Sequence, residues 1–113
     1  MEKFDFYKDG IYYKLNPDKK TVSVTRQYID CQRLDSYHIS KLSIPSNVTW
    51  EDKTYTVTII ECDAFNSCRN LKEIIIPNSI TYIGDGAFKN CIMLASINIP
   101  NSISRIGNHT FIV

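Results

Sequence analysis

Apolar residues in the second half of the chain follow a short alternating pattern that ends at a proline. The segment L-x-x-I-x-I-P places Ile74 and Ile76 on one face of an extended strand and Ile75 on the other. Pro77 ends this strand, because proline has no N–H to give to a β-ladder. The following N-S-I-x-x-I predicts a second short extended piece whose isoleucines point inward, before a glycine-rich turn.

The same pattern returns after 23 residues. Residues 60–82 and 83–105 align without a gap and are identical at 11 of 23 positions, and a third copy begins with IGNHTF. A fixed period of this length indicates a solenoid, because one unit cannot bury its apolar face alone and must stack on its neighbour. The positions that keep the period are Val57/Ile80/Ile103, Ile60/Ile83/Ile106, Phe65/Phe88/Phe111, Cys68/Cys91, Leu71/Leu94 and Pro77/Pro100.

The full motif, I-G-x-x-A-F-x-x-C-x-x-L-x-x-I-x-I-P-x-S-I, resembles the leucine-rich repeat of the BspA type, also called the Treponema pallidum type. The resemblance covers roughly residues 42–113. It implies a mostly β solenoid with a parallel sheet on the concave side and irregular, short extended or 3₁₀ structure on the convex side. Two departures are visible: the glycine usual before the cysteine is replaced by Ser67 or Asn90, and the last repeat is incomplete.

The first repeat carries an insertion. Its proline, Pro45, precedes Pro77 by 32 residues, which is 23 + 9. The extra residues lie in VTWEDKTYTV, where alternating residues on either side of Glu51-Asp52-Lys53 predict a β-hairpin. Trp50 and Tyr55 on this hairpin are candidate exposed aromatic anchors for a partner. The alternative, that they pack across the hairpin and stabilise it, is favoured.

The N-terminal third has a different pattern. Residues 11–15 and 21–25 alternate as two strands, and Asn16-Pro17-Asp18-Lys19-Lys20 joins them as a turn. A solenoid needs a cap on its first coil, which would otherwise expose apolar surface. We therefore assign residues 1–41 to an N-terminal β-rich cap and residues 42–113 to the repeats. The stretch 26–41 has no periodicity and is predicted as a loop.

A small set of residues is expected to point outward from the concave strands and to form the binding face. On the opposite side, Tyr82, a further candidate anchor, should stack in one column with Ile59 and Arg105. The residues expected on the concave face are Lys41, Ser43, Lys72, Glu73, Ile75, Ala95, Ser96 and Asn98.

Two of the four cysteines share one repeat position. Cys68 and Cys91 should stack about 4.8 Å apart, which falls in the range of disulfide Cα distances. Parallel side chains do not converge, however, so the pattern favours two buried thiols acting as small hydrophobes. Cys62 occupies a turn position and is expected to be exposed, and Cys31 lies in the cap.

Catalytic and metal-binding signatures find little support in the sequence. There is no G-x-S-x-G, no H-E-x-x-H and no glycine-rich phosphate loop. His38 could pair with Asp35 or Cys31 for nucleophilic chemistry, but a lone histidine in a polar loop is more often solvated. His38 and His109 are not paired with cysteines at ligand spacing. We therefore predict no enzyme activity, no cofactor and no metal site.

The charge balance excludes some partners. Thirteen basic and twelve acidic residues give a net charge of +1, which argues against nucleic acid or an anionic membrane as the main partner. No apolar run approaches the roughly 18 residues of a membrane span, so membrane insertion is not expected. The N-terminus shows no apolar signal-peptide region. The resemblance, in contrast, implies a bacterial protein that is secreted or displayed at the cell surface.

Two functional hypotheses follow. The first, which the resemblance implies, is a non-catalytic module for protein interaction or adhesion, with a host or extracellular matrix protein among the possible partners. The second is a structural unit that self-associates through the apolar end of its incomplete last repeat, where Ile103, Ile106 and Phe111 lie.

Overall fold

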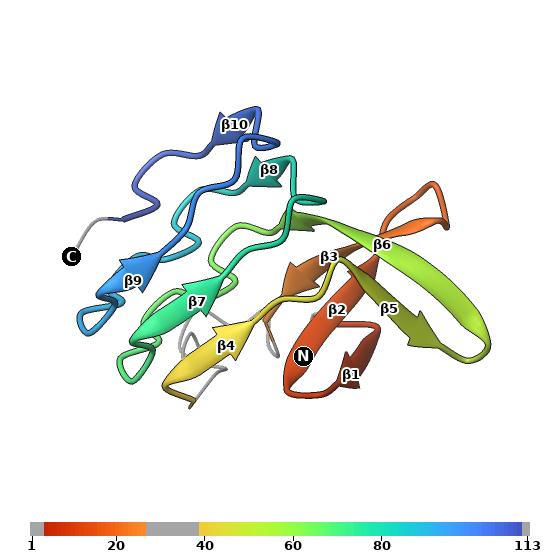
Figure 1. Cartoon of the computed structure of the whole chain (residues 1–113), viewed down its shortest axis with the longest axis horizontal. Helices are drawn as coiled ribbons and strands as arrows, with labels where there is room; N and C mark the ends of the chain where they lie inside the picture. The colour runs from red at the N-terminus through yellow and green to blue at the C-terminus, as the bar shows by residue number, and fades with distance from the viewer. Residues whose placement is uncertain (1–3, 27–38, 112–113) are drawn as a thin grey trace.

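The protein, described by a computed structural model over residues 4–26 and 39–111, is built from strands and turns. Within these residues the chain forms ten β-strands and no helix, arranged in two sheets (Figure 1). The sheets enclose one hydrophobic core. The mostly β fold predicted from the repeat is confirmed. The predicted loop at 26–41 falls largely outside the described residues, as do Cys31 and His38.

The smaller sheet is parallel and contains one strand from each repeat. Strands β4 (Lys41–Ser43), β7 (Glu73–Ile75) and β9 (Ser96–Ile97) lie in the order β4-β7-β9. Leu42 pairs with Ile74, and Ile74 pairs with Ile97, so equivalent repeat positions lie directly beside one another. The alternation inferred from I-x-I is correct: Ile74 and Ile76 are buried and Ile75 is exposed.

The larger sheet runs along the other side of the molecule, in the order β1-β2-β3-β6-β8-β10, with β5 paired to β6. It contains both predicted hairpins and one further strand, β1, that the sequence did not predict. Its strands are β1 (Phe6–Lys8), β2 (Ile11–Leu15), β3 (Thr21–Thr25), β5 (Asn47–Trp50), β6 (Lys53–Ile60), β8 (Tyr82–Ile83) and β10 (Arg105–Ile106).

This sheet is more continuous than the family resemblance implies for the convex side. The reason is that the N-terminal hairpin is not a detached lid: β3 pairs in parallel with β6, and β6 pairs in parallel with β8. The division into a cap at 1–41 and repeats at 42–113 stays a prediction, because the sheet passes from β3 into β6 without interruption.

Aromatic side chains stack along the solenoid axis between the sheets. The rings of Phe65 and Phe88 are 5.3 Å apart and nearly parallel, and those of Phe88 and Phe111 are 5.6 Å apart. The isoleucines of the second extended piece, Ile80 and Ile83, are fully buried. The 23-residue period therefore records side chains that lie one above the next in the core.

The coils approach one another closely at a conserved turn within the repeat. A Cβ built on Gly84 would lie 2.5 Å from the backbone nitrogen of Cys62 in the preceding coil. Gly107, one period later, lies equally close to the backbone of Asp85. Glycine is required at these two positions because only a residue without a side chain permits this spacing.

The two cysteines at the shared repeat position are buried free thiols, and Cys62 is exposed, as predicted. Cys91 lies close to the previous coil, with its sulfur 3.0 Å from the carbonyl oxygen of Phe65. Burial raises the pKa of the Cys91 thiol to about 11, against a smaller lowering from a backbone hydrogen bond with Cys68. Both thiols therefore remain neutral parts of the core at physiological pH.

Candidate binding face

The outward side chains of the small sheet form two columns across the coils. The strand register places Lys41, Glu73 and Ser96 in one column, and Ser43 beside Ile75 in the other. These residues come from segments far apart in the sequence, and stacking of the repeats brings them onto one face (Figure 1). Lys72 is also exposed but precedes β7 rather than lying in it. We refer to the outward residues of β4, β7 and β9 as the concave face.

The concave face has an apolar centre with polar neighbours. Ile75 is 51% exposed although it lies on the middle strand of the sheet. On the same face, Lys41 and Ser96 are exposed and Glu73 is half-buried. Lys41 and Glu73 are direct neighbours of opposite charge, so this face carries little net charge.

Asn98 has a structural role that sequence reasoning did not detect. Its side-chain oxygen accepts a hydrogen bond from the backbone N–H of Ile76 at 2.8 Å, and its amide donates to the carbonyl oxygen of Ile76 at 2.9 Å. The side chain thus continues the strand ladder where β9 has ended. A contribution of Asn98 to binding stays a prediction, but its amide is already used to join two coils.

The aromatic residues of the hairpin are not an exposed pair. Tyr55 is only 8% exposed, so its predicted role as an exposed anchor is wrong. Trp50 is partly exposed, and its ring stacks on Phe6 of β1 with centroids 4.9 Å apart and planes at 9°. The two residues do not pair across the hairpin either, because Tyr55 lies opposite Val48 and Trp50 opposite Lys53. Both pack towards Phe6, a contact that the sequence could not show.

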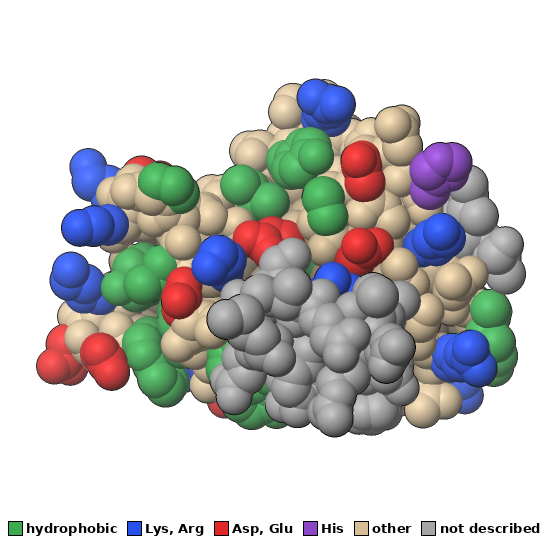
Figure 2. Space-filling model, turned by 180° about the vertical axis from the view of Figure 1, so that it is seen from behind, with side chains coloured by type: hydrophobic (Ala, Val, Ile, Leu, Met, Phe, Trp, Pro, Cys, Tyr) green, Lys and Arg blue, Asp and Glu red, His purple; other side chains and the backbone are tan. Residues whose placement is uncertain are grey.

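Tyr82, the remaining candidate anchor, lies half-buried on the other side of the molecule. It pairs with Ile59 on β6 and with Arg105 on β10, as the repeat predicted. It also lines a cavity of about 410 Å³ together with Lys14, Ile59 and Glu61. Basic and acidic side chains are interspersed over this rear surface rather than gathered by sign (Figure 2).

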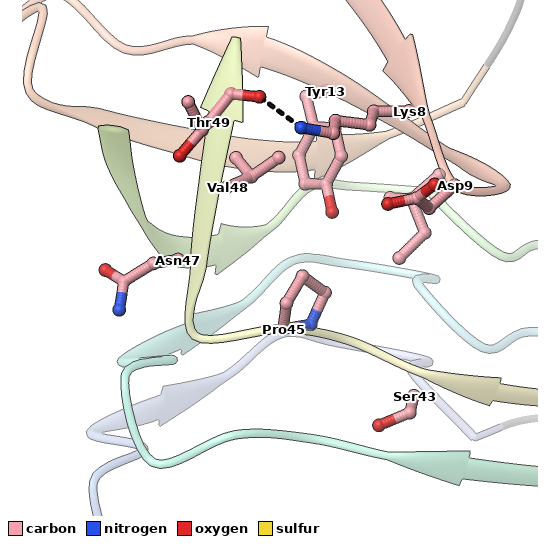
Figure 3. A pocket seen from close by; sticks show the side chains of 9 residues that line it. Lys8, Asp9, Tyr13, Ser43, Pro45, Asn47, Val48 and Thr49 are labelled. Carbon is pink, nitrogen blue, oxygen red and sulfur yellow. Dashed lines mark hydrogen bonds between the residues drawn. The ribbon is translucent and has the colours of Figure 1, made fainter. Parts of the chain in front are cut away.

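A second cavity, of about 280 Å³, lies between the β1–β2 turn and the segment from β4 to β5 (Figure 3). We call it the junction cavity. The β1–β2 turn contributes Asp9, β2 contributes Tyr13, and Ser43 comes from the concave face. Sequence reasoning did not detect this site, because it depends on how the N-terminal hairpin docks against the first coil.

Metal-binding groups and membrane-spanning helices were sought among the described residues. At 4–26 and 39–111 there is no group of three or more His, Cys, Asp or Glu side chains able to hold a metal ion. Over the same residues the structure has no helix of the length and hydrophobicity that crossing a bilayer requires.

Comparison with known families identifies the repeats. The family described as "BspA type Leucine rich repeat region" matches residues 36–113, in 6 copies. This match covers more than half of the chain. No match was found among curated protein sequences.

Solved structures with the same fold come from several bacteria. A leucine-rich repeat protein of Bacteroides ovatus shares 37% identity over 88% of this chain, with a TM-score of 0.75. The leucine-rich repeat protein of T. pallidum shares 25% identity over 92% of the chain, with a TM-score of 0.69. This chain spans only 24% and 42% of those two proteins. A Bacteroides capillosus leucine-rich repeat protein, at 20% identity, is similar in fold, with a TM-score of 0.71 and 92% of each chain covered.

Proposed function

Because the chain belongs to the BspA-type leucine-rich repeat family, whose members generally act as protein-interaction modules rather than enzymes, we propose that it binds a protein partner through its concave face. The observation that carries the proposal is the exposure of Ile75 on the middle strand of that face. An apolar centre with a polar rim is the usual anatomy of a protein interface, and a few central residues supply most of the binding energy.

The size of the face limits what it does alone. Its three strands contain three, three and two residues, whereas a stable interface usually buries about 800 Å² on each partner. A partner would therefore also contact surface beside the sheet. Lys72, Ser43 and Asn98 lie at its borders and are the remaining residues that we assign to binding.

The proposal can be tested by selecting binding peptides and mapping them with matched variants. The immobilised chain would be used to select peptides from a random twelve-residue phage-display library, and their affinities would then be measured by calorimetry. We expect Ile75→Ser to weaken the selected peptides by tenfold or more, about 1.4 kcal/mol or above.

Ile92→Ser is the matched control, because Ile92 is exposed to a similar degree but lies outside the sheet. It should leave the affinity within about twofold, a change of roughly 0.4 kcal/mol. Peptides that bind the Ile75→Ser variant as tightly as the unchanged chain would contradict binding at the concave face.

We also propose that the module acts outside the cell, in adhesion to a host or extracellular matrix protein. The support for this location is the resemblance to the family, and the charge pattern is consistent with a protein partner. Biotinylation of intact cells of the source organism with a membrane-impermeant reagent tests it. The protein should be labelled on intact cells, and labelling only after lysis would contradict an extracellular location.

A second candidate function, self-association, is favoured by one observation. The last coil exposes a group of large apolar side chains, and in the part of the chain that the structure describes β9 and β10 each pair on one side only. Exposed apolar surface beside unpaired strand edges favours association with another copy. The apolar residues are Ile92, Met93, Ile99, Ile106 and Phe111.

Light scattering over a dilution series tests self-association. A pair of copies would have a mass of 2 × 13.0 = 26.0 kDa. The double variant Ile99→Lys/Ile106→Lys should reduce the mass to that of a single chain, whereas Ile75→Lys on the concave face should not. A single chain at every concentration, before any substitution, would contradict this candidate.

A further inference from the structure

The junction cavity contains a buried hydroxyl group with no partner. Tyr13 is only 1% exposed, and its hydroxyl points into the cavity (Figure 3). Among residues 4–26 and 39–111 this hydroxyl makes no hydrogen bond. An unpaired buried polar group is costly, so the site is arranged to receive a polar atom that the chain itself does not supply.

The state of this hydroxyl is set by its surroundings. Burial raises the pKa of the Tyr13 hydroxyl well above its usual value, and the negative charge of Asp9 adds to the effect. The group is therefore neutral at physiological pH and offers both an acceptor oxygen and a proton. Its oxygen and the Asp9 carboxylate line the same small space.

The two charged residues of the cavity are not equally available. The Lys8 ammonium donates a hydrogen bond to the carbonyl oxygen of Thr49 at 2.6 Å. Asp9, in contrast, is exposed and has no hydrogen-bond partner within the described part of the chain. Its backbone is held in the left-handed region at φ 49°, which fixes it at the β1–β2 turn. The free charge in the cavity is thus an acceptor.

The remaining walls are apolar. Ile11, Pro45 and Val48 line the space between the polar groups. A volume of about 280 Å³ is at the lower limit for small-molecule sites and suits one long side chain better than a drug-sized ligand. An aliphatic stem would contact these walls while a terminal polar group reached Tyr13 and Asp9.

We propose that the junction cavity receives a lysine or arginine side chain of the bound protein, with the cation between the Asp9 carboxylate and the Tyr13 oxygen. The inference rests on the proposed function for the source of that side chain. Ser43 belongs both to the cavity and to the concave face, so a partner lying on that face reaches the cavity directly. The cavity would select among partners by demanding a cation at one position.

The test is a titration of the isotope-labelled chain followed by NMR, with short peptides as probes. The probes are acetyl-Gly-Lys-Gly-amide, the norleucine peptide that keeps the stem without the charge, and the glutamate peptide. We expect the lysine peptide to shift the backbone amide signals of Asp9, Tyr13 and Ser43 in a saturable way. Equal shifts with the norleucine or glutamate peptide, or no shift with the lysine peptide, would overturn the inference.

Matched variants assign the effect to the two polar groups. Asp9→Asn keeps a residue that tolerates positive φ and should weaken the lysine peptide about tenfold or more. Asp52→Asn makes the same change at another exposed positive-φ position, φ 66°, and should have no effect. Tyr13→Phe removes the unpaired hydroxyl, so it should leave folding intact and still weaken the peptide. Unchanged affinity in both cavity variants would overturn the assignment.

Two further arms separate this inference from the proposed function. Ile75→Ser should leave the lysine peptide unaffected, whereas it weakens the selected twelve-residue peptides. If those peptides depend on Ile75 but the lysine peptide does not bind, the cavity inference fails alone. n-Butylammonium should bind more weakly than the peptide, and equal binding would point to a free amine and overturn the protein source.

Discussion

At the residue scale, two side chains adopt a backbone conformation that glycine usually provides. Ser67 and Asn90 hold the same repeat position, and both have positive φ, 64° and 61°. Asparagine tolerates this region because its short polar side chain hydrogen-bonds locally, whereas serine has no comparable advantage. Ser67 does donate a side-chain hydrogen bond to Asn66 at 2.8 Å, which offsets part of the strain.

We therefore expect Ser67→Gly to raise the free energy of unfolding by about 0.5–1 kcal/mol. The gain comes from removing a side chain at positive φ, less the lost hydrogen bond. Ser96→Gly makes the same change in a strand and should lower the free energy of unfolding by a similar amount. Urea denaturation of both variants measures the two effects, and a destabilised Ser67→Gly would show that the hydroxyl outweighs the strain.

A second residue-scale prediction concerns the buried thiol of Cys91. Its pKa in the folded chain is about 11, whereas the ordinary value is 9.0. Above pH 9 the unfolded chain releases the thiol proton and the folded chain retains it, so unfolding is favoured as pH rises. This contribution to stability is complete below pH 9 and is lost as pH rises to about 11, at a cost on the order of 2 kcal/mol.

Cys91→Ala should therefore reduce the fall in unfolding free energy between pH 9 and 11, even though it lowers stability at pH 7 by leaving a cavity. Cys62→Ala, at an exposed cysteine, should leave the pH dependence as it is. Urea denaturation under reducing conditions at a series of pH values gives both curves. Parallel curves for Cys91→Ala and the unchanged chain would rule out the thiol as the source.

At the scale of elements, the sequence predicted what its own periodicity encodes. The I-x-I alternation gave the strands of the small sheet, and the turn residues gave both hairpins, with Glu51 and Asp52 at positive φ at one tip. It did not predict β1. A strand of three residues has too few positions to show alternation, and its order depends on pairing with β2 and on the contact between Phe6 and Trp50.

The candidate site was predictable to the same extent. The repeat register brought Lys41, Glu73 and Ile75 onto one face before any coordinates were considered. Tyr55 was misplaced because its burial depends on β1, and the structural role of Asn98 depends on where β9 stops. The junction cavity arises between two hairpins with no shared sequence pattern.

The contact between Phe6 and Trp50 leads to an element-scale prediction. Trp50 is the single tryptophan of the chain, so its fluorescence reports directly on how β1 packs against the β5–β6 hairpin. Phe6→Leu removes the stacked ring and should change the emission of the folded chain. It should also lower the free energy of unfolding by about 1 kcal/mol or more.

Phe111→Leu is the matched control for this change. It alters a ring that stacks on Phe88 at the other end of the solenoid. The emission of the folded chain should stay as it is, because no ring near Trp50 has changed. Similar emission spectra for Phe6→Leu and the unchanged chain would mean that β1 does not pack on the hairpin in solution.

At the scale of the whole molecule, the same repeat position is buried in one coil and exposed in the next. Ile76 is 2% exposed and Ile99, 23 residues later, is 45% exposed. The N-terminal hairpin closes the sheet on one side through β3, while β9 and β10 carry no further strand among the described residues. Stability in a solenoid is a sum of repeat and neighbour terms, so it should decline along the chain.

The last prediction uses this pair of equivalent isoleucines. Ile76→Ala should lower the free energy of unfolding by about 2–5 kcal/mol, because it empties a buried site. Ile99→Ala should cost under about 0.5 kcal/mol in dilute solution, since the side chain already contacts water. Chemical denaturation of both variants gives the comparison, and equal costs would mean that the last coil is covered.

Protein concentration decides what covers it. If a second copy packs on the last coil, the cost of Ile99→Ala should grow as the protein is concentrated, because association stabilises only the folded chain. The cost of Ile76→Ala, as a difference within one chain, should then vary far less. A cost of Ile99→Ala that is small and the same at every concentration would leave the concave face, with Ile75 at its centre, as the surface where a partner binds.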